Sequence, residues 1–88
     1  MMDTYFKDVK SDLREFIKNN FMYASDSHDL DDDTSFLDRG IIDSTGVLEI
    51  IDFLEESYDI SIENGEVIPD NLDSINRINR FVNRKISG

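Results

Sequence analysis

The sequence contains no cysteine and no tryptophan, and its 88 residues include only one proline and four glycines. Without cysteine the chain can form neither disulfides nor thiolate metal sites, which fits a reducing compartment. No apolar run approaches the roughly 18 residues that a membrane-spanning helix requires, and residues 1–10 lack the apolar segment of a signal peptide. We therefore expect a cytoplasmic protein that has no membrane segment.

Basic residues are also scarce, because nine Lys and Arg stand against twenty Asp and Glu, and the net charge is −11. Binding to nucleic acid depends on cationic side chains that displace the counterions of phosphate groups, so neither a nucleic acid nor an anionic membrane is expected as a partner. Residues 26–66 are rich in acids and contain one basic residue, Arg39. Such a surface is expected to attract proteins with basic patches.

A chain of this length forms one small domain, which we assign to residues 1–88, and its core is thin. Apolar residues at helical spacing predict helices over about residues 4–19, 44–58 and 74–86. A short helical turn is predicted over about residues 65–68, where Pro69 would end it. The polar segment between the first two helices shows no periodicity and is interpreted as a long loop. The predicted fold class is all-α, a four-helix bundle of three longer helices and one short helix.

The same spacing predicts which residues of each helix face the core. These are Tyr5, Val9, Leu13, Phe16 and Ile17 in the first helix, Leu48, Ile51, Leu54 and Tyr58, widened by Val47 and Ile50, in the second, and Ile75, Ile78, Val82 and Ile86, joined by Phe81, in the last. Asp3 is expected to cap the first helix, and Asp73 or Ser74 the last. Such bulky side chains leave little spare volume in the core.

Ordinary catalytic and metal-binding patterns are weak in this sequence. The one histidine, His28, lies in a polar loop without a cysteine to pair with, and we interpret it as a solvated surface residue. The spacing of Asp29, Asp31 and Asp33 imitates the start of a calcium loop. However, Thr34 stands where that loop needs glycine, and its final glutamate is missing. We therefore predict no metal site and no catalytic residue, and the protein is not expected to be an enzyme.

The remaining candidate is the pair Asp43-Ser44 at the start of the predicted second helix. The segment 35–44 (SFLDRGIIDS), followed by Leu48-Glu49 and Leu54-Glu55-Glu56, resembles the acyl and peptidyl carrier protein family. The order of helices and loop follows that family's four-helix bundle over nearly the whole chain. The resemblance implies that Ser44, with Asp43 as its motif neighbour, receives 4′-phosphopantetheine from coenzyme A through a phosphopantetheinyl transferase. The thiol of this arm would hold an acyl or aminoacyl group as a thioester.

The resemblance also implies a docking surface for partner enzymes along the second helix. No Lys or Arg lies between Gly40 and Arg77 to balance the acids there, and like charges on one helix repel each other. A partner's basic patch is therefore expected to supply the positive charge. The implied partners are the transferase, a ligase that loads the arm, and a downstream transferase, acting on a monomer. The residues expected to contact them are Asp38, Thr45, Val47, Glu49, Asp52, Glu55 and Glu56.

Two positions depart from the family pattern, since Thr45 stands where leucine is common and Gly46 where a larger polar residue is frequent. Thr45 argues against a simple assignment to fatty-acid synthesis, and the segment 71–75 (NLDSI) is similar to freestanding carriers of amino acids. The leading hypothesis is therefore a carrier that an adenylate-forming ligase loads. The alternatives are a carrier of fatty-acid or polyketide synthesis, and an acidic helical adaptor that is never modified.

Overall fold

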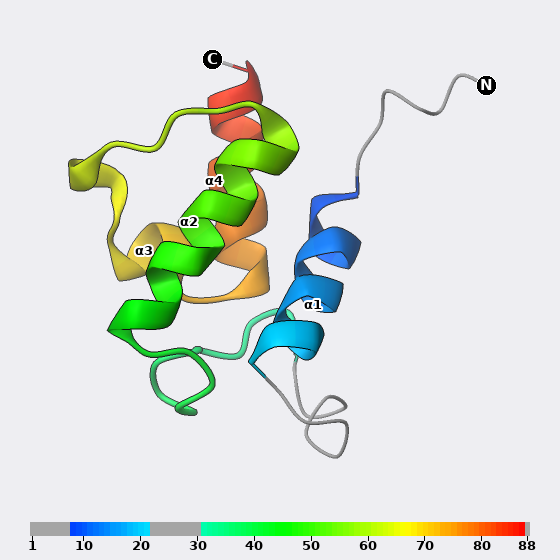
Figure 1. The fold of residues 1–88 in the computed structure, drawn as a ribbon, viewed down its shortest axis with the longest axis vertical. Coiled ribbons are helices and arrows are strands. Elements are labelled where there is room, and N and C mark those ends of the chain that lie inside the picture. The colour runs from blue at the N-terminus through cyan, green and yellow to red at the C-terminus, as the bar shows by residue number, and fades with distance from the viewer. Residues whose placement is uncertain (1–7, 22–30, 88) are drawn as a thin grey trace.

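The computed structural model of the protein describes residues 8–21 and 31–87, and within these ranges it contains helices and no strand. The elements are α1 (Val9–Asn20), α2 (Ser44–Tyr58), a 3-10 helix (Asn64–Glu66), α3 (Pro69–Leu72) and α4 (Ile75–Ser87). α2 and α4 run in the same direction, and α1 runs against both (Figure 1). The prediction of an all-α bundle with three longer helices and a short one is confirmed.

The packing centres on α4, which contacts each of the other three α-helices. Its buried residues are Ile75, Ile78, Phe81 and Val82. Ser74 caps this helix, since its Oγ accepts the N–H of Arg77 at 3.1 Å. Ile86 was expected inside but is 54% exposed. It lies one turn beyond Val82, where the buried stripe ends in the last turn of the helix.

The first helix begins later than the sequence pattern indicates. Asp8 is the N-cap of α1, and its side chain accepts the N–H of Ser11 at 3.2 Å. The predicted cap Asp3 and the first predicted core residue, Tyr5, lie outside the described residues. Within α1 the predicted stripe is confirmed, with Phe16 partly buried. The fully buried residues of this helix are Val9, Leu13 and Ile17.

The bounds of α2 coincide with the predicted residues 44–58, but the predicted inward face is partly wrong. Leu48 is 61% exposed, and the buried residues of the helix are Gly46, Ile50 and Leu54. Ile51 and Tyr58 are only partly buried. The predicted line drifts around the helix, because residues spaced three apart fall short of one turn.

Two contacts made by aromatic residues join α1 to α2, one by ring stacking and one by a hydrogen bond. Phe16 stacks on Phe53 with ring centroids 4.3 Å apart, and the hydroxyl of Tyr58 donates to Asp12 Oδ2 at 2.9 Å. Burial raises the pKa of Tyr58, and the hydrogen bond to the Asp12 carboxylate raises that pKa further. Tyr58 therefore remains a neutral hydrogen-bond donor.

The chain between α2 and α4 differs from the prediction. A 3-10 helix and a short α-helix replace the single turn expected over residues 65–68, and Pro69 begins α3 instead of ending a turn. Proline is well tolerated at the first helical position, where its missing N–H costs no hydrogen bond. This segment returns the chain from the end of α2 to the start of α4, as two parallel helices require (Figure 1).

Candidate functional site

The Asp43-Ser44 pair lies at the start of α2. Asp43 is the N-cap, and its Oδ1 accepts the N–H of Gly46 at 2.8 Å. Ser44 is the first residue of the helix and is exposed. Because Asp43 provides the cap, the hydroxyl of Ser44 is not needed for that role and can be reached by another molecule.

The residues before Ser44 fix its position. Gly40 has a φ of 68°, in the left-handed region that glycine adopts most readily. The turn is closed by the N–H of Ile41, which donates to the carbonyl of Phe36 at 2.9 Å. Ile42 is 2% exposed and belongs to the core. A buried residue therefore anchors the chain two positions before the exposed serine.

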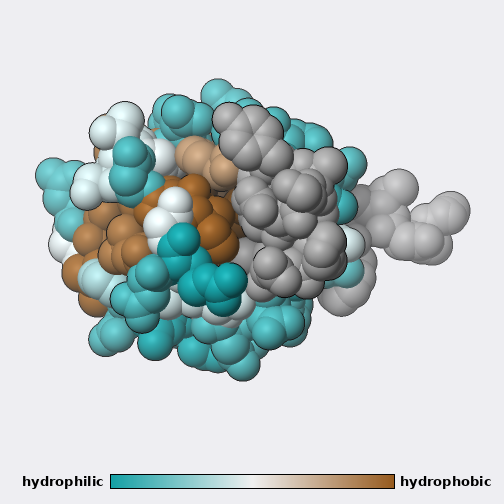
Figure 2. Space-filling model, turned by 90° about the horizontal axis from the view of Figure 1, so that it is seen from below, coloured by the Kyte–Doolittle hydropathy of each residue, from teal (hydrophilic) through white to brown (hydrophobic). Residues whose placement is uncertain are grey.

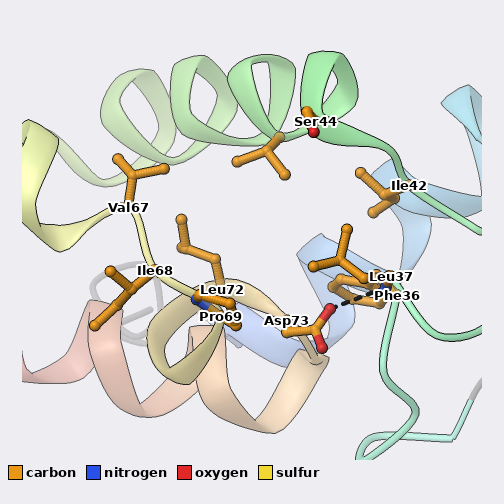
Figure 3. Close-up of a pocket in the computed structure, with 10 residues that line it drawn as sticks. Phe36, Leu37, Ile42, Ser44, Val67, Ile68, Pro69, Leu72 and Asp73 are labelled. Atoms are coloured by element: carbon orange, nitrogen blue, oxygen red, sulfur yellow. Dashed lines mark hydrogen bonds between the residues drawn. The ribbon is translucent and has the colours of Figure 1, made fainter.

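An apolar groove with a volume of about 200 Å³ lies beside Ser44, and we call it the Ser44 groove. Figure 3 shows Ser44 at its edge on α2, with Ile68 and Leu37 on opposite sides. At the end of the bundle where α2 begins, apolar surface is exposed next to hydrophilic residues (Figure 2). Leu37 and Ile68 are 48% and 44% exposed, so the rim of the groove is apolar as well. The lining residues are Phe36, Leu37, Ile42, Ser44, Val47, Val67, Ile68, Pro69, Leu72 and Asp73.

The structure gives a reason for Gly46, one of the two departures from the family pattern. A Cβ at this position would lie 2.8 Å from Cε1 of Phe21 and 2.9 Å from Cγ2 of Ile42. Carbon atoms in favourable contact are about 3.5–4.0 Å apart. The first turn of α2 therefore packs against these two side chains more closely than a residue with a Cβ would allow.

Four of the seven residues expected to contact partners form one exposed line along α2, which we call the α2 acidic stripe. Its members are Thr45, Glu49, Asp52 and Glu56. Their spacing of four, three and four residues places them on one face of the helix. In the described part of the chain, no ion pair involves this stripe. The ion pairs there join Lys10 and Arg14 to Asp32, and Lys85 to Glu66.

The structure places the other three expected contact residues differently. Val47 is half-buried and lines the Ser44 groove. Asp38 is exposed in the loop before α2, and its N–H donates to Ser35 Oγ at 3.1 Å. Glu55 is partly buried, and its Oε2 accepts the N–H of Ile62 at 2.9 Å. Glu55 therefore holds the chain after α2.

Charge pairing is concentrated away from Ser44. Asp32 accepts hydrogen bonds from Lys10, at 3.3 Å, and from Arg14. Desolvation raises the pKa of Asp32, but these two hydrogen bonds and the two positive charges outweigh it, so that the pKa lies below its ordinary value. A hydrogen bond from the backbone of Glu63 and the ammonium of Lys85 lower the pKa of Glu66.

The described residues include no group of three or more potential ligands that could hold a metal ion. Of the three acids that imitate a calcium loop, Asp33 accepts a hydrogen bond from Asn76 Nδ2 at 2.6 Å. Asp29 and His28 lie outside the described residues. Among the described helices, none combines the length and the apolar character that a membrane crossing would need.

Sequence reasoning missed the groove residues that come from the segment between α2 and α4. Val67, Ile68, Leu72 and Asp73 form the side of the groove that faces α2 and the loop before it. The apolar character of Val67, Ile68 and Leu72 was visible in the sequence. Their place opposite Ser44 depends on tertiary contacts that no short-range pattern indicates.

No protein-family model matches the chain. The D-alanyl carrier proteins of Streptococcus sanguinis and Streptococcus mutans are each 35% identical to it over 71 residues, which cover 81% of this chain and 86% of theirs. The D-alanyl carrier protein of Streptococcus gordonii is 37% identical with the same coverage. These names describe carriers and not catalysts, and the helical bundle agrees with them. The chain belongs to the acyl and peptidyl carrier protein family and is a carrier protein, not a catalytic enzyme.

Proposed function

We propose that the protein holds an aminoacyl group as a thioester on 4′-phosphopantetheine attached to Ser44, and presents it to partner enzymes. The observation that carries this proposal is the position of Ser44. Ser44 is exposed at the first position of α2, directly after the N-cap Asp43 and at the edge of an apolar groove. In this proposal the 88 residues act as one domain, as a monomer and in the cytoplasm.

The residues around Ser44 fit this attachment. The Ser44 oxygen would form an ester bond to the phosphorus of the phosphopantetheinyl group as the pyrophosphate bond of coenzyme A breaks. The hydroxyl proton would pass to a base of the transferase, and adenosine 3′,5′-bisphosphate would leave. A phosphodiester is negatively charged and suits the N-terminus of a 15-residue helix, where unpaired backbone N–H groups and the helix dipole favour anions. When bound, the group supplies a thiol that can form a thioester, which a chain without cysteine lacks.

The Ser44 groove fits the part of the arm nearest to the attachment. Apart from Ser44 and Asp73, the residues that line it are apolar. Its volume of about 200 Å³ lies below the roughly 300–1,000 Å³ of pockets that enclose a drug-sized ligand. The groove can therefore hold part of an arm, but not a long acyl chain in addition. This favours a small cargo over the fatty-acid and polyketide alternative.

The relatives support an amino acid as that cargo, because they are named as carriers of a D-alanyl group. We propose a small aminoacyl group that an adenylate-forming ligase transfers to the arm. Its ammonium would be costly to bury away from water. An open groove at the surface allows the ammonium to stay solvated while the arm contacts apolar side chains.

The α2 acidic stripe is the surface that we propose for docking of the phosphopantetheinyl transferase, the ligase and a downstream transferase. It begins at Thr45, next to the attachment site, and it is exposed along the helix. A basic patch on a partner would relieve the repulsion among Glu49, Asp52 and Glu56 and would speed the encounter. Val47 lines the groove and Asp38 is exposed in the loop before α2, and we propose that both contact the same partners.

The test is intact-mass measurement after incubation with coenzyme A and a broad-specificity phosphopantetheinyl transferase. Wild type should gain the mass of one phosphopantetheinyl group, and Ser44→Ala should gain none. Ser61→Ala is the matched control, since Ser61 is also exposed, and it should be modified like wild type. Modification of Ser44→Ala, or no modification of wild type, would overturn the proposal, and the second result would favour the unmodified adaptor. Adding a ligase, ATP and single amino acids to the modified protein would then identify the cargo.

A further inference from the structure

The loop side of the Ser44 groove is hydrogen-bonded to Asp73. Its backbone carbonyl accepts the N–H of Phe36 at 3.0 Å, and its Oδ1 accepts the N–H of Leu37 at 2.9 Å (Figure 3). Its Oδ2 accepts the hydroxyl of Ser35. Phe36 and Leu37 line the groove, as Asp73 itself does. Three consecutive loop residues are thus bonded to a single residue that follows 36 positions after Leu37.

Asp73 is itself fixed between two helices. It is the C-cap of α3, where its N–H donates to the carbonyl of Pro69 at 3.0 Å. The next residue, Ser74, is buried and caps α4. The carboxylate therefore projects from a junction that both helices hold in place.

A second residue of this junction, Asn76, holds an earlier part of the same loop. Its backbone N–H donates to the carbonyl of Asp32 at 2.9 Å, and its side chain donates to Asp33 at 2.6 Å. Neither aspartate lines the Ser44 groove. Of the two junction residues, only Asp73 bonds to the part of the loop that forms the groove wall.

We propose that Asp73 is the positioning residue of the Ser44 groove, because it fixes the loop wall against which an arm on Ser44 rests. The effect of Asp73 on an arm rests on the proposed function, but its hydrogen bonds to the loop do not. A carboxylate suits the role, since its two oxygens can accept two donors at once and its charge strengthens both bonds. Alanine would remove both side-chain acceptors. Asparagine would keep one oxygen for Leu37, and its amide could donate to Ser35.

The first test uses the unmodified full chain and amide hydrogen exchange measured by NMR. In Asp73→Ala the amide of Leu37 should exchange about tenfold faster or more, because hydrogen bonds to charged groups are among the stronger ones. Asp73→Asn should retain most of the protection. Asp70→Ala is the control, since Asp70 is exposed on the same short helix, and it should leave the exchange unchanged.

The amide of Val82, buried in α4, distinguishes a positioning role from a general loss of stability. If Asp73 positions the loop, Leu37 should be affected far more than Val82 in Asp73→Ala. If both amides accelerate by the same factor, or if Leu37 is unaffected, the positioning role is wrong.

The second test uses the same variants with an isotope-labelled arm, and records nuclear Overhauser contacts between the arm and methyl groups of the groove. Wild type and Asp70→Ala should show contacts to Leu37 and to Ile68 on the opposite wall. In Asp73→Ala the Ile68 contacts should persist while the Leu37 contacts weaken severalfold, and undiminished Leu37 contacts would contradict the proposal. If wild type takes up no arm, the proposed function fails, and the exchange of Leu37 in the unmodified chain still decides whether Asp73 fixes the loop.

Discussion

Replacing Gly46 with alanine changes a closely packed position near the proposed attachment site. In an unobstructed helix, alanine is favoured over glycine by about 1 kcal/mol. Here the new Cβ would lie 2.8 Å from a ring carbon of Phe21 and 2.9 Å from a methyl carbon of Ile42. Overpacking by one methyl-sized group typically costs about 1–3 kcal/mol. Because Ile42 is buried in the core and has little room to move, the clash should outweigh the helix propensity and lower the free energy of unfolding by about 1 kcal/mol.

Urea denaturation followed by circular dichroism measures this change as a lower midpoint with an unchanged slope. Gly65→Ala is the matched control, since nothing lies within 4 Å of a Cβ there, and its effect should stay within about 0.5 kcal/mol. Phe21→Leu combined with Gly46→Ala should recover part of the loss, because leucine lacks the ring carbon that clashes. If Gly46→Ala alone raised the free energy of unfolding by about 1 kcal/mol, as in an open helix, the packing argument would be refuted.

Four further predictions concern the docking surface, the loop contacts and the cargo. Glu49→Lys should slow association with the transferase at low salt and leave stability unchanged or slightly raised; loading rates equal to wild type would remove the α2 acidic stripe as the docking surface. Glu55→Ala should lower the free energy of unfolding by about 1 kcal/mol, since the N–H of Ile62 loses its acceptor, and equal stability of Glu55→Ala and Glu56→Ala in urea would contradict this. The lowered pKa of Asp32 means that its ion pairs stabilise the fold above the ordinary carboxyl pKa, and that this contribution is lost as the pH falls through the folded value. Asp32→Asn should therefore be less stable than wild type at neutral pH and equal to it in strong acid, as thermal melts across pH would measure. Loading the arm should shift NMR signals near Ser44 and leave Leu54, Ile75 and Ile78 nearly unchanged, whereas large shifts at these three would place the cargo in the core.

The periodicity of the sequence predicted the helices well where one face of a helix is buried along its length. The stripes of α1 and α4 keep the expected spacing, and their inward residues up to Val82 are in the core. Leu48 was expected in the core but is exposed, because the first turns of α2 face the core with Gly46 and Ile50. A glycine carries no hydrophobic signal, so the sequence pattern included Ile50 but placed Leu48 on the inward face in place of Gly46. Tertiary packing, and not local propensity, decided which face of α2 turned inward.

The proposed attachment site could be picked out from the sequence, and the groove beside it could not. Ser44 stands out through its neighbours in the sequence, and the structure places it in an exposed position behind the cap Asp43. The groove requires Pro69 to begin a helix, and it requires Asp73 to bond to a loop 36 residues earlier. A contact over that sequence distance leaves no periodic trace. The role of Glu55 was missed for another reason, since the N–H that it accepts belongs to a segment without regular structure.

The packed core and the open groove together determine where a group attached to Ser44 can lie. Leu54, Ile75 and Ile78 have no exposed surface. A cavity as large as the groove, about 200 Å³, would cost about 5 kcal/mol if opened among them, at roughly 24 cal/mol per Å³. That cost is comparable with the whole stability of a small domain, about 5–15 kcal/mol. The Ser44 groove already exists at the surface, and an arm lying in it would cover the exposed apolar rim instead of breaking core contacts. The ammonium of an aminoacyl group increases this difference in free energy, because it would have to lose its water in the core but not at the rim of the groove. The arm is therefore expected to follow the groove and to leave its thioester at the surface, where a partner docked on the α2 acidic stripe can reach it.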